Sequence, residues 1–203
     1  MLAVFKQRGF RVLGCDSSRA LCDRARRIWG LEVHCGTLKS VDAQDGFDLI
    51  VLNHVLEHVQ NPLELLAEVR ARLSPGGVAH IAVPNVACWE AQLPGWVSYE
   101  PYHLLYFDAP SLKAAIEAVG LSIQRLSTHE SFSGWFLAIL RTVLRGKGRG
   151  ADGLAGLHGG RRPLVEHSYR AAMALAGVIS LPFRLIQQAL GKGDELVVLA
   201  TQS

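Results

Sequence analysis

The sequence lacks the features expected of secreted and nucleic-acid-binding proteins. Its four cysteines form no C-x-x-C pair, and Lys6 and Arg8 occupy positions where a signal peptide needs an apolar core. The net charge is only +3, from 21 Lys+Arg against 18 Asp+Glu, which is small for a protein that must neutralise many phosphates. We therefore expect a cytoplasmic protein with reduced thiols and no nucleic-acid partner.

Long apolar segments are also missing. The apolar run at 171–183 would reach only about 20 Å as a helix, whereas the hydrocarbon core of a bilayer is about 30 Å thick. With 203 residues, 49% of them hydrophobic, the chain can bury one ordinary core without disulfides or metals. We expect a single domain over 1–203.

Up to residue 127, short β-branched runs alternate with helical patterns, which predicts an α/β fold with a doubly wound, mostly parallel, Rossmann-like sheet. The strands are expected at 10–15, 31–35, 47–53, 78–83, 121–127 and 195–201. The helices are expected at 1–8, 18–29, 62–73 and 111–119. The segment FDLIVLN (47–53) has hardly a polar side chain, so we expect that strand to be buried on both faces.

Residues 128–192 are expected to form a helical insertion between the core (1–127) and a final strand within 193–203. Helical patterns at 132–144 and 164–190 flank a flexible spacer, 146–163, with seven glycines among eighteen residues. The helices would form a lid or simply pack on each other. Because basic residues bracket the spacer, peripheral membrane contact through 132–190 stays open as an alternative.

Polar residues follow several expected strands, and in doubly wound sheets ligands bind beyond the carboxyl ends of the strands. Asp16 ends the strand at 10–15, and two carboxylate oxygens match the vicinal hydroxyls of a ribose. The alternative is that Asp16 only caps the next helix.

Several motifs together resemble class I S-adenosylmethionine-dependent methyltransferases, with the ubiquinone-biosynthesis-type O-methyltransferases as the nearest subgroup. They are FDLIVLNHVLEHVQNP (47–62), LLAEVRARLSPGGVAHIAVPN (65–85), Gly14-x-Asp16-x-Ser18 and Pro101-x-His103. The resemblance covers 1–127 and resumes at 193–200. It implies S-adenosylmethionine as cofactor and methyl transfer to a small-molecule, lipid-linked or sugar-linked acceptor, most readily at oxygen.

The resemblance also assigns roles to residues. The cofactor would lie against Asp16 and Ser17 (ribose), Gly36, Thr37 and Leu38 (adenine), and Asn53 and His54 (methionine end). The catalytic candidates are His103, His54 and His58, because histidine can take a proton near neutral pH. An acceptor pocket could be walled by aromatic side chains, namely Trp89, Trp96, Tyr99, Tyr102 and Tyr106.

The spacing H-x-x-E-H, from His54 to His58, is also a zinc-binding pattern. It directly follows a strand and coincides with the LEH of the methyltransferase pattern, so no metal ligands are expected. A structural role for Glu57 and His58 stays open. His54 and His58, four residues apart, could share one face of a helical turn.

The sequence departs from the family at its start. A glycine-rich turn precedes the ribose-binding acid by about 20 residues in such folds, and counting back from Asp16 places it before Met1. The family's first strand and glycine motif are thus expected to be missing, which predicts weak cofactor binding and self-association.

A non-catalytic binding or scaffold protein is the alternative function. A dehydrogenase is disfavoured because no Tyr-x-x-x-Lys occurs.

Overall fold

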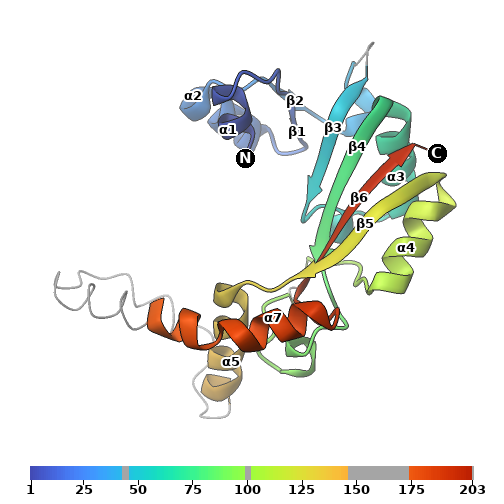
Figure 1. The fold of residues 1–203 in the computed structure, drawn as a ribbon. Helices are drawn as coiled ribbons and strands as arrows, with labels where there is room; N and C mark the ends of the chain where they lie inside the picture. Colours follow the sequence, from blue (N-terminus) through green and yellow to red (C-terminus); the bar gives the residue numbers. More distant parts are fainter. Residues whose placement is uncertain (43–45, 99–101, 146–173, 203) are drawn as a thin grey trace.

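The computed structural model describes residues 1–42, 46–98, 102–145 and 174–202 (Figure 1). The strands are β1 (Gly14–Asp16), β2 (Val33–Cys35), β3 (Phe47–Asn53), β4 (Leu73–Pro84), β5 (Leu121–His129) and β6 (Glu195–Gln202). The α-helices are α1 (Leu2–Gln7), α2 (Arg19–Trp29), α3 (Pro62–Arg72), α4 (Ala109–Ala118), α5 (Phe132–Arg145) and α7 (Leu181–Ala189). Short 3₁₀ turns are η1 (Leu38–Ser40), η2 (Leu56–His58) and η3 (Glu90–Gln92).

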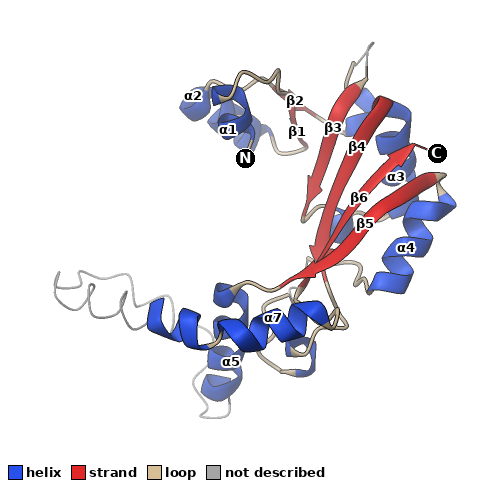
Figure 2. Ribbon diagram, in the orientation of Figure 1, coloured by secondary structure: helices blue, strands red, loops and turns tan. Residues whose placement is uncertain are grey.

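The strands form two sheets. β1 and β2 pair in parallel, and the larger sheet has the order β3-β4-β6-β5 (Figure 2). β3 is parallel to β4, while β6 is antiparallel to both β4 and β5. The α/β expectation is confirmed. Three strands of the larger sheet run in one direction as predicted, but the insertion of β6 between β4 and β5 makes the sheet mixed.

Local signals in the sequence set the helix starts. The Ser18 hydroxyl accepts the Leu21 amide at the start of α2. The Asn61 side chain caps α3, with Pro62 at its first turn, and Asp108 begins α4 with a capping box. These starts are close to the predicted ones. The strand expected at 10–15 is wrong in extent, because only residues 14–16 pair with β2.

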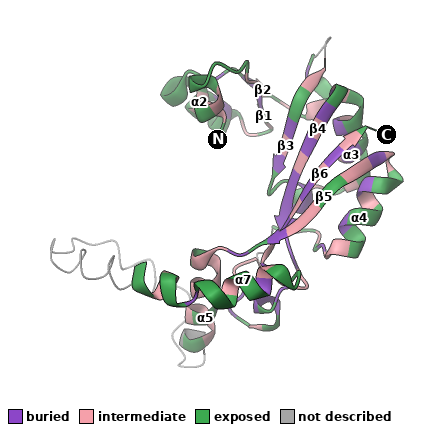
Figure 3. Ribbon diagram, viewed as in Figure 1, coloured by how far each residue is buried: buried purple, intermediate pink, exposed green. Residues whose placement is uncertain are grey.

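The core lies between the larger sheet and helices α3 and α4, which cover the same face of it (Figure 2). Residues alternate along β6 between buried and partly exposed, as expected where helices cover one face (Figure 3). The fully buried side chains of this core include Leu56, Leu66, Val69, Ile81, Val83, Leu112, Ile116, Leu196 and Val198.

The expectation that FDLIVLN is buried on both faces is wrong. Ile50 and Leu52 of β3 are buried, but the Leu49 side chain is 43% exposed. β3 is an edge strand of the larger sheet, so within the described residues only β4 pairs with it. The β1–β2 pair lies beyond its open edge, separate from it (Figure 1).

The helical segment before β6 packs on itself and on the end of the sheet. The rings of Trp135 in α5 and Phe183 in α7 have centroids 6.1 Å apart, and the Arg184 guanidinium lies 5.5 Å from the Phe132 ring centroid. The Gly95 amide donates to Thr142 Oγ1 of α5.

The spacer expected at 146–163 lies outside the described residues. Within the described ranges, no helix combines the length and apolarity needed to cross a bilayer.

A buried polar cluster ties α7 to the sheet. The fully buried Gln187 amide nitrogen lies 2.6 Å from Glu90 Oε2, 2.9 Å from Glu130 Oε2 and 2.9 Å from the Lys192 carbonyl oxygen. The Asp194 amide also donates to Glu130 Oε2. Burial, with the nearby Asp194 and Glu90 carboxylates, raises the pKa of Glu130 to about 8. The cluster therefore favours a protonated Glu130 at neutral pH.

Candidate functional site

The turn after β3 has an unusual backbone. His54 has φ 53°, and within the described residues it is the only non-glycine residue with positive φ. Such a conformation costs roughly 1–3 kcal/mol and persists only where neighbouring contacts hold it. Here the His54 amide donates to the Ala82 carbonyl of β4. The strain lies at the carboxyl end of β3, the position that the sequence singled out.

Both ring nitrogens of His54 are held by carboxylates. Nε2 lies 2.9 Å from Glu195 Oε1, and Nδ1 lies 3.1 Å from Glu57 Oε1. The hydrogen bond to Glu195 and then that to Glu57 raise the pKa of His54 to about 10. The same contact with His54 lowers the pKa of Glu195. His54 is thus a bridging cation rather than a proton acceptor, which argues against the predicted use of His54 as a base.

His58 and His103 come together although 45 positions separate them. The amides of Leu104 and Leu105 both donate to the Glu57 carbonyl oxygen, which fastens this segment to η2. The two imidazole rings meet edge to face, with centroids 4.7 Å apart. The expectation that His54 and His58 share a helical face is wrong, because residues 56–58 form a 3₁₀ turn and His54 precedes it in a left-handed conformation.

Aromatic side chains surround His103. Its ring centroid lies 5.4 Å from that of Tyr102 and 6.2 Å from that of Tyr106, and Tyr106 lies 6.2 Å from Trp96. Trp89 is separate from this group and contacts Phe183 of α7 at 5.1 Å. The aromatic residues predicted to line one pocket thus fall into two sets, one around His103 and one at Trp89, and Tyr99 lies outside the described residues.

The predicted ribose and adenine residues gather at the ends of β1 and β2. Asp16 Oδ1 accepts the Ser18 amide at 2.7 Å, and the Asp16 carbonyl accepts the Gly36 amide at 3.0 Å. A Cβ on Gly36 would come within 2.8 Å of His34 Nε2 and Ser40 Oγ, so these two side chains would have to move to admit a larger residue. Asp16 therefore supports the turn into α2, but the capping alternative is wrong because Ser18 is the N-cap of that helix, and Asp16 still presents a carboxylate at a strand end.

Of the remaining predicted residues, some lie near the larger sheet and others near the Asp16–Gly36 group. Thr37 is the N-cap of η1, and Leu38 packs against the main core. The Arg72 guanidinium donates to the Lys39 carbonyl, joining η1 to α3. Asn53 ends β3 and is exposed, as is Ser17. Within the described ranges no hydrogen bond joins Asp16, Ser17 or Gly36 to Asn53 or His54, so the candidate site consists of two groups.

One functional residue, Glu195, was not found from the sequence. It begins β6, and its partner His54 is 141 positions away. The signal available was an acidic residue at the start of the final expected strand, but sequence spacing alone does not show which strand it joins. Only the antiparallel insertion of β6 beside β4 brings it to the turn after β3.

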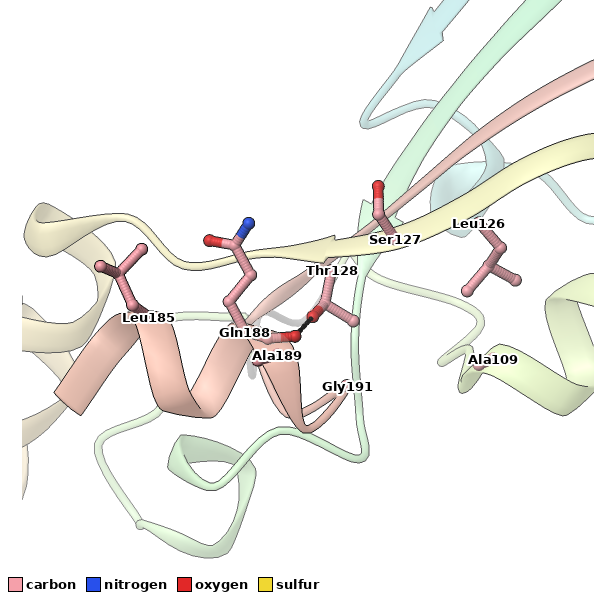
Figure 4. Close-up of a pocket in the computed structure, with 8 residues that line it drawn as sticks. All are labelled: Ala109, Leu126, Ser127, Thr128, Leu185, Gln188, Ala189 and Gly191. Carbon is pink, nitrogen blue, oxygen red and sulfur yellow. Dashed lines mark hydrogen bonds between the residues drawn. The ribbon is translucent and has the colours of Figure 1, made fainter. Parts of the chain in front are cut away.

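A separate cavity of about 390 Å³ lies where the end of β5 meets α7 (Figure 4). Its lining comes from β5, α7 and their neighbours: Ala109, Leu126, Ser127, Thr128, Leu185, Gln188, Ala189 and Gly191. The Thr128 hydroxyl donates to the Gln188 carbonyl within it. None of the predicted cofactor or catalytic residues lines this cavity.

Comparison with known proteins identifies the sequence family. The model of a methyltransferase domain family matches residues 1–126. A curated relative, an uncharacterized 37.1 kDa protein in transposon TN4556 of Streptomyces fradiae, is 27% identical over 169 residues. That match covers 81% of this chain and 48% of the relative, so the chain spans about half the length of the curated relative.

Solved structures share the fold. A SAM-dependent methyltransferase from Archaeoglobus fulgidus matches with a TM-score of 0.60 and 17% identity, over 99% of this chain and 80% of the other. The [4+2]-cyclase SpnF matches with a TM-score of 0.57 and 18% identity, over 99% and 70% of the two chains.

A G-x-G-x-x-G spacing does occur in this chain at 148–153, but it lies outside both the described residues and the family match.

Proposed function

The chain belongs to the methyltransferase domain family, and on that premise we propose that it is an S-adenosylmethionine-dependent methyltransferase. We propose further that its acceptor is a small, lipid-linked or sugar-linked molecule methylated at oxygen, as in the ubiquinone-biosynthesis-type subgroup. The observation that carries the proposal is the placement of a carboxylate, Asp16, at the end of β1 beside the Gly36 turn. This is the position at which doubly wound folds bind a ribose.

The Asp16 carboxylate fits the nucleoside part of the cofactor. Its Oδ1 is held by the Ser18 amide, which fixes the plane of the carboxylate, and a carboxylate can accept further hydrogen bonds from two hydroxyls. The closely packed turn at Gly36, together with Thr37 and Leu38, would contact the adenine ring of the cofactor. When bound, S-adenosylmethionine supplies a methyl group activated by a positively charged sulfur.

The protein's own contribution would be alignment and exclusion of water. Methyl transfer is an in-line displacement, so most of the rate acceleration would come from holding the acceptor in line with the methyl group. The strained turn at Asn53 and His54 would face the methionine end, and its rigidity comes from the contacts of His54 with Glu57 and Glu195. These contacts make His54 a positioning residue.

His103 is the proposed base for an acceptor that carries a proton. Its Nδ1 lies 2.8 Å from the Ser98 carbonyl oxygen and must donate a proton to it, which leaves Nε2 to accept one. Tyr102 and Tyr106 flank the ring and would contact an apolar acceptor. His58 lies against the same ring and would help to orient the acceptor.

The proposal is tested by transfer of a radiolabelled methyl group from S-adenosylmethionine to separated aqueous and lipid extracts. We expect label in a small-molecule or lipid fraction, and a turnover about 10²-fold lower for His103→Gln with cofactor affinity nearly unchanged. His129→Gln, an exposed histidine on β5, is the matched control. Label that goes only to protein or nucleic acid would contradict the proposal.

A second function, a non-catalytic binding or scaffold protein, is favoured by one observation. Within the described residues, no hydrogen bond joins the predicted cofactor residues at Asp16 and Gly36 to those at Asn53 and His54. Calorimetric titration separates the two functions. Binding of S-adenosylmethionine without transfer to any fraction would favour the scaffold.

A further inference from the structure

We propose that Glu57, His58 and His103 form a binding site for a divalent transition metal, with Zn²⁺ the best match. One ligand atom from each of these residues lies within 4.8 Å of the other two. The zinc-binding spacing in the sequence pairs His54 with His58 instead. The fold replaces His54 in that set by His103, because carboxylates hold both ring nitrogens of His54.

The histidines are oriented as metal ligands usually are. His58 Nδ1 lies 3.1 Å from the Tyr102 carbonyl oxygen, and His103 Nδ1 lies 2.8 Å from the Ser98 carbonyl oxygen. Each Nδ1 must donate a proton to its carbonyl, so in the neutral rings both Nε2 atoms carry a lone pair. A backbone carbonyl behind the ring is a common outer partner of a metal-binding histidine, since it fixes both the tautomer and the ring plane.

Glu57 supplies the negative charge that the two neutral imidazoles lack. Its side chain is only 1% exposed, and its Oε2 is buried without a hydrogen-bond partner among the described residues. A buried carboxylate oxygen with no partner is costly unless a cation or donor satisfies it. The other oxygen, Oε1, lies 3.9 Å from His58 Nε2 and 3.1 Å from His54 Nδ1.

The distances are compatible with coordination after small side-chain rotations. Tetrahedral ligands that lie about 2.1 Å from Zn²⁺ are about 3.4 Å from one another. The His58 Nε2 to Glu57 Oε1 separation exceeds this by about half an ångström, and His58 and His103 are partly exposed and can adjust. Two nitrogens and one carboxylate leave the fourth position open, as in catalytic rather than structural zinc sites.

The open position gives the site a role in the proposed reaction, and this step rests on the proposed function. A hydroxyl bound to the metal would lose its proton to solvent water more readily, because the cation stabilises the resulting oxyanion, which would then take the methyl group as the sulfur–methyl bond of S-adenosylmethionine breaks. With metal bound, His103 Nε2 is a ligand, and activation of the acceptor passes from His103 to the metal. The preferred acceptor would then be a hydroxyl or phenol that can coordinate through oxygen.

The site can be tested by metal titration of the whole chain, without cofactor or acceptor. Cys15→Ser and Cys35→Ser should first remove the two exposed thiols, which would otherwise compete for the metal. Co²⁺ serves as the coloured probe, and Zn²⁺ is then used to displace it. Single variants His58→Gln and His103→Gln are compared with His129→Gln, which changes an exposed histidine elsewhere.

We expect one Co²⁺ per chain with visible absorption typical of four- or five-coordination, and at least tenfold weaker binding for His58→Gln and His103→Gln. His129→Gln should bind like the parent, and Zn²⁺ should raise the melting temperatures of the parent and of His129→Gln but not those of His58→Gln and His103→Gln. Thermal melts of the metal-free variants establish that they fold. Equal Co²⁺ affinity in all four proteins, or no binding, would overturn the site. Metal binding without methyl transfer would instead contradict only the proposed function.

Discussion

His54 Nε2 lies 2.9 Å from Glu195 Oε1, and this contact fastens the turn after β3 to the first residue of β6. His54 adopts a positive φ, so the turn depends on such contacts to hold its conformation. Glu195→Gln keeps the shape but removes the charge that pairs with the imidazolium. Because the pair is partly exposed, we expect the free energy of unfolding to fall by only about 1 kcal/mol in urea titrations.

Glu64→Gln is the control for this substitution. Glu64 pairs with Lys39 at 3.5 Å, but both side chains are more than half exposed, so the change should lie within about 0.5 kcal/mol. An equal loss in the two variants would show that the His54–Glu195 contact does not stabilise the turn.

The buried Glu130 predicts a pH-dependent stability. Its pKa is raised to about 8 by burial and by the Asp194 and Glu90 carboxylates, while the hydrogen bond from the Asp194 amide and, more weakly, the Arg184 cation act in the opposite direction. The folded protein thus binds more protons than the unfolded chain between about pH 4.5 and 8, so its stability falls as the pH rises through this window. Burial likewise raises the pKa of Asp194 to about 6, which adds to the slope below neutrality.

Glu130→Gln should flatten this slope, since a neutral amide replaces a group that must ionise. Gln can still accept the hydrogen bonds from Gln187 and from the Asp194 amide. The measurement is chemical denaturation at pH 5, 6, 7 and 8, with the exposed Glu117→Gln as control. A variant whose stability falls with pH as steeply as the parent would contradict the role of Glu130.

The open edge of β3 predicts self-association. Leu49 is exposed there, and among the described residues only β4 pairs with β3. Unpaired edges with apolar side chains attract other strands, and a lysine at an edge suppresses such pairing. Leu49→Lys should therefore convert associated protein to monomer in sedimentation velocity at about 100 µM.

Leu63→Lys provides the comparison for Leu49→Lys. Leu63 is 45% exposed but lies on α3, away from the strand edge. If both lysines dissolve the assembly equally, a general gain in solubility explains the result and pairing of β3 edges does not.

Local features of the fold could be predicted from the sequence, because they depend on neighbouring residues. Ser18, Asn61 and Asp108 cap their helices through bonds to amides three residues later. The burial of β3 could not be predicted, because an apolar run does not show whether a strand has one neighbour or two. Its edge position emerges only from the sheet order.

The candidate site was predictable in its parts but not in its arrangement. The turns at Asp16 and His54 follow strands, as the motifs indicated. The contacts of His58 with His103 and of His54 with Glu195 join segments that are far apart in the sequence. The first contact requires the segment after β4 to pack against η2, and the second requires β6 to begin beside the turn after β3. Short-range spacing instead suggested a His54–His58 pair, which the left-handed backbone at His54 prevents.

The proposed cofactor site is tested most directly by hydrogen exchange of the amides with and without S-adenosylmethionine. We predict slower exchange at 16–18, 36–38 and 53–54, and at least tenfold weaker binding for Asp16→Ala but not for the exposed Asp23→Ala, because a carboxylate that accepts two hydroxyl hydrogen bonds contributes a few kcal/mol. Protection confined to the separate cavity around Thr128 and Gln188, or equal affinity in both variants, would contradict the account.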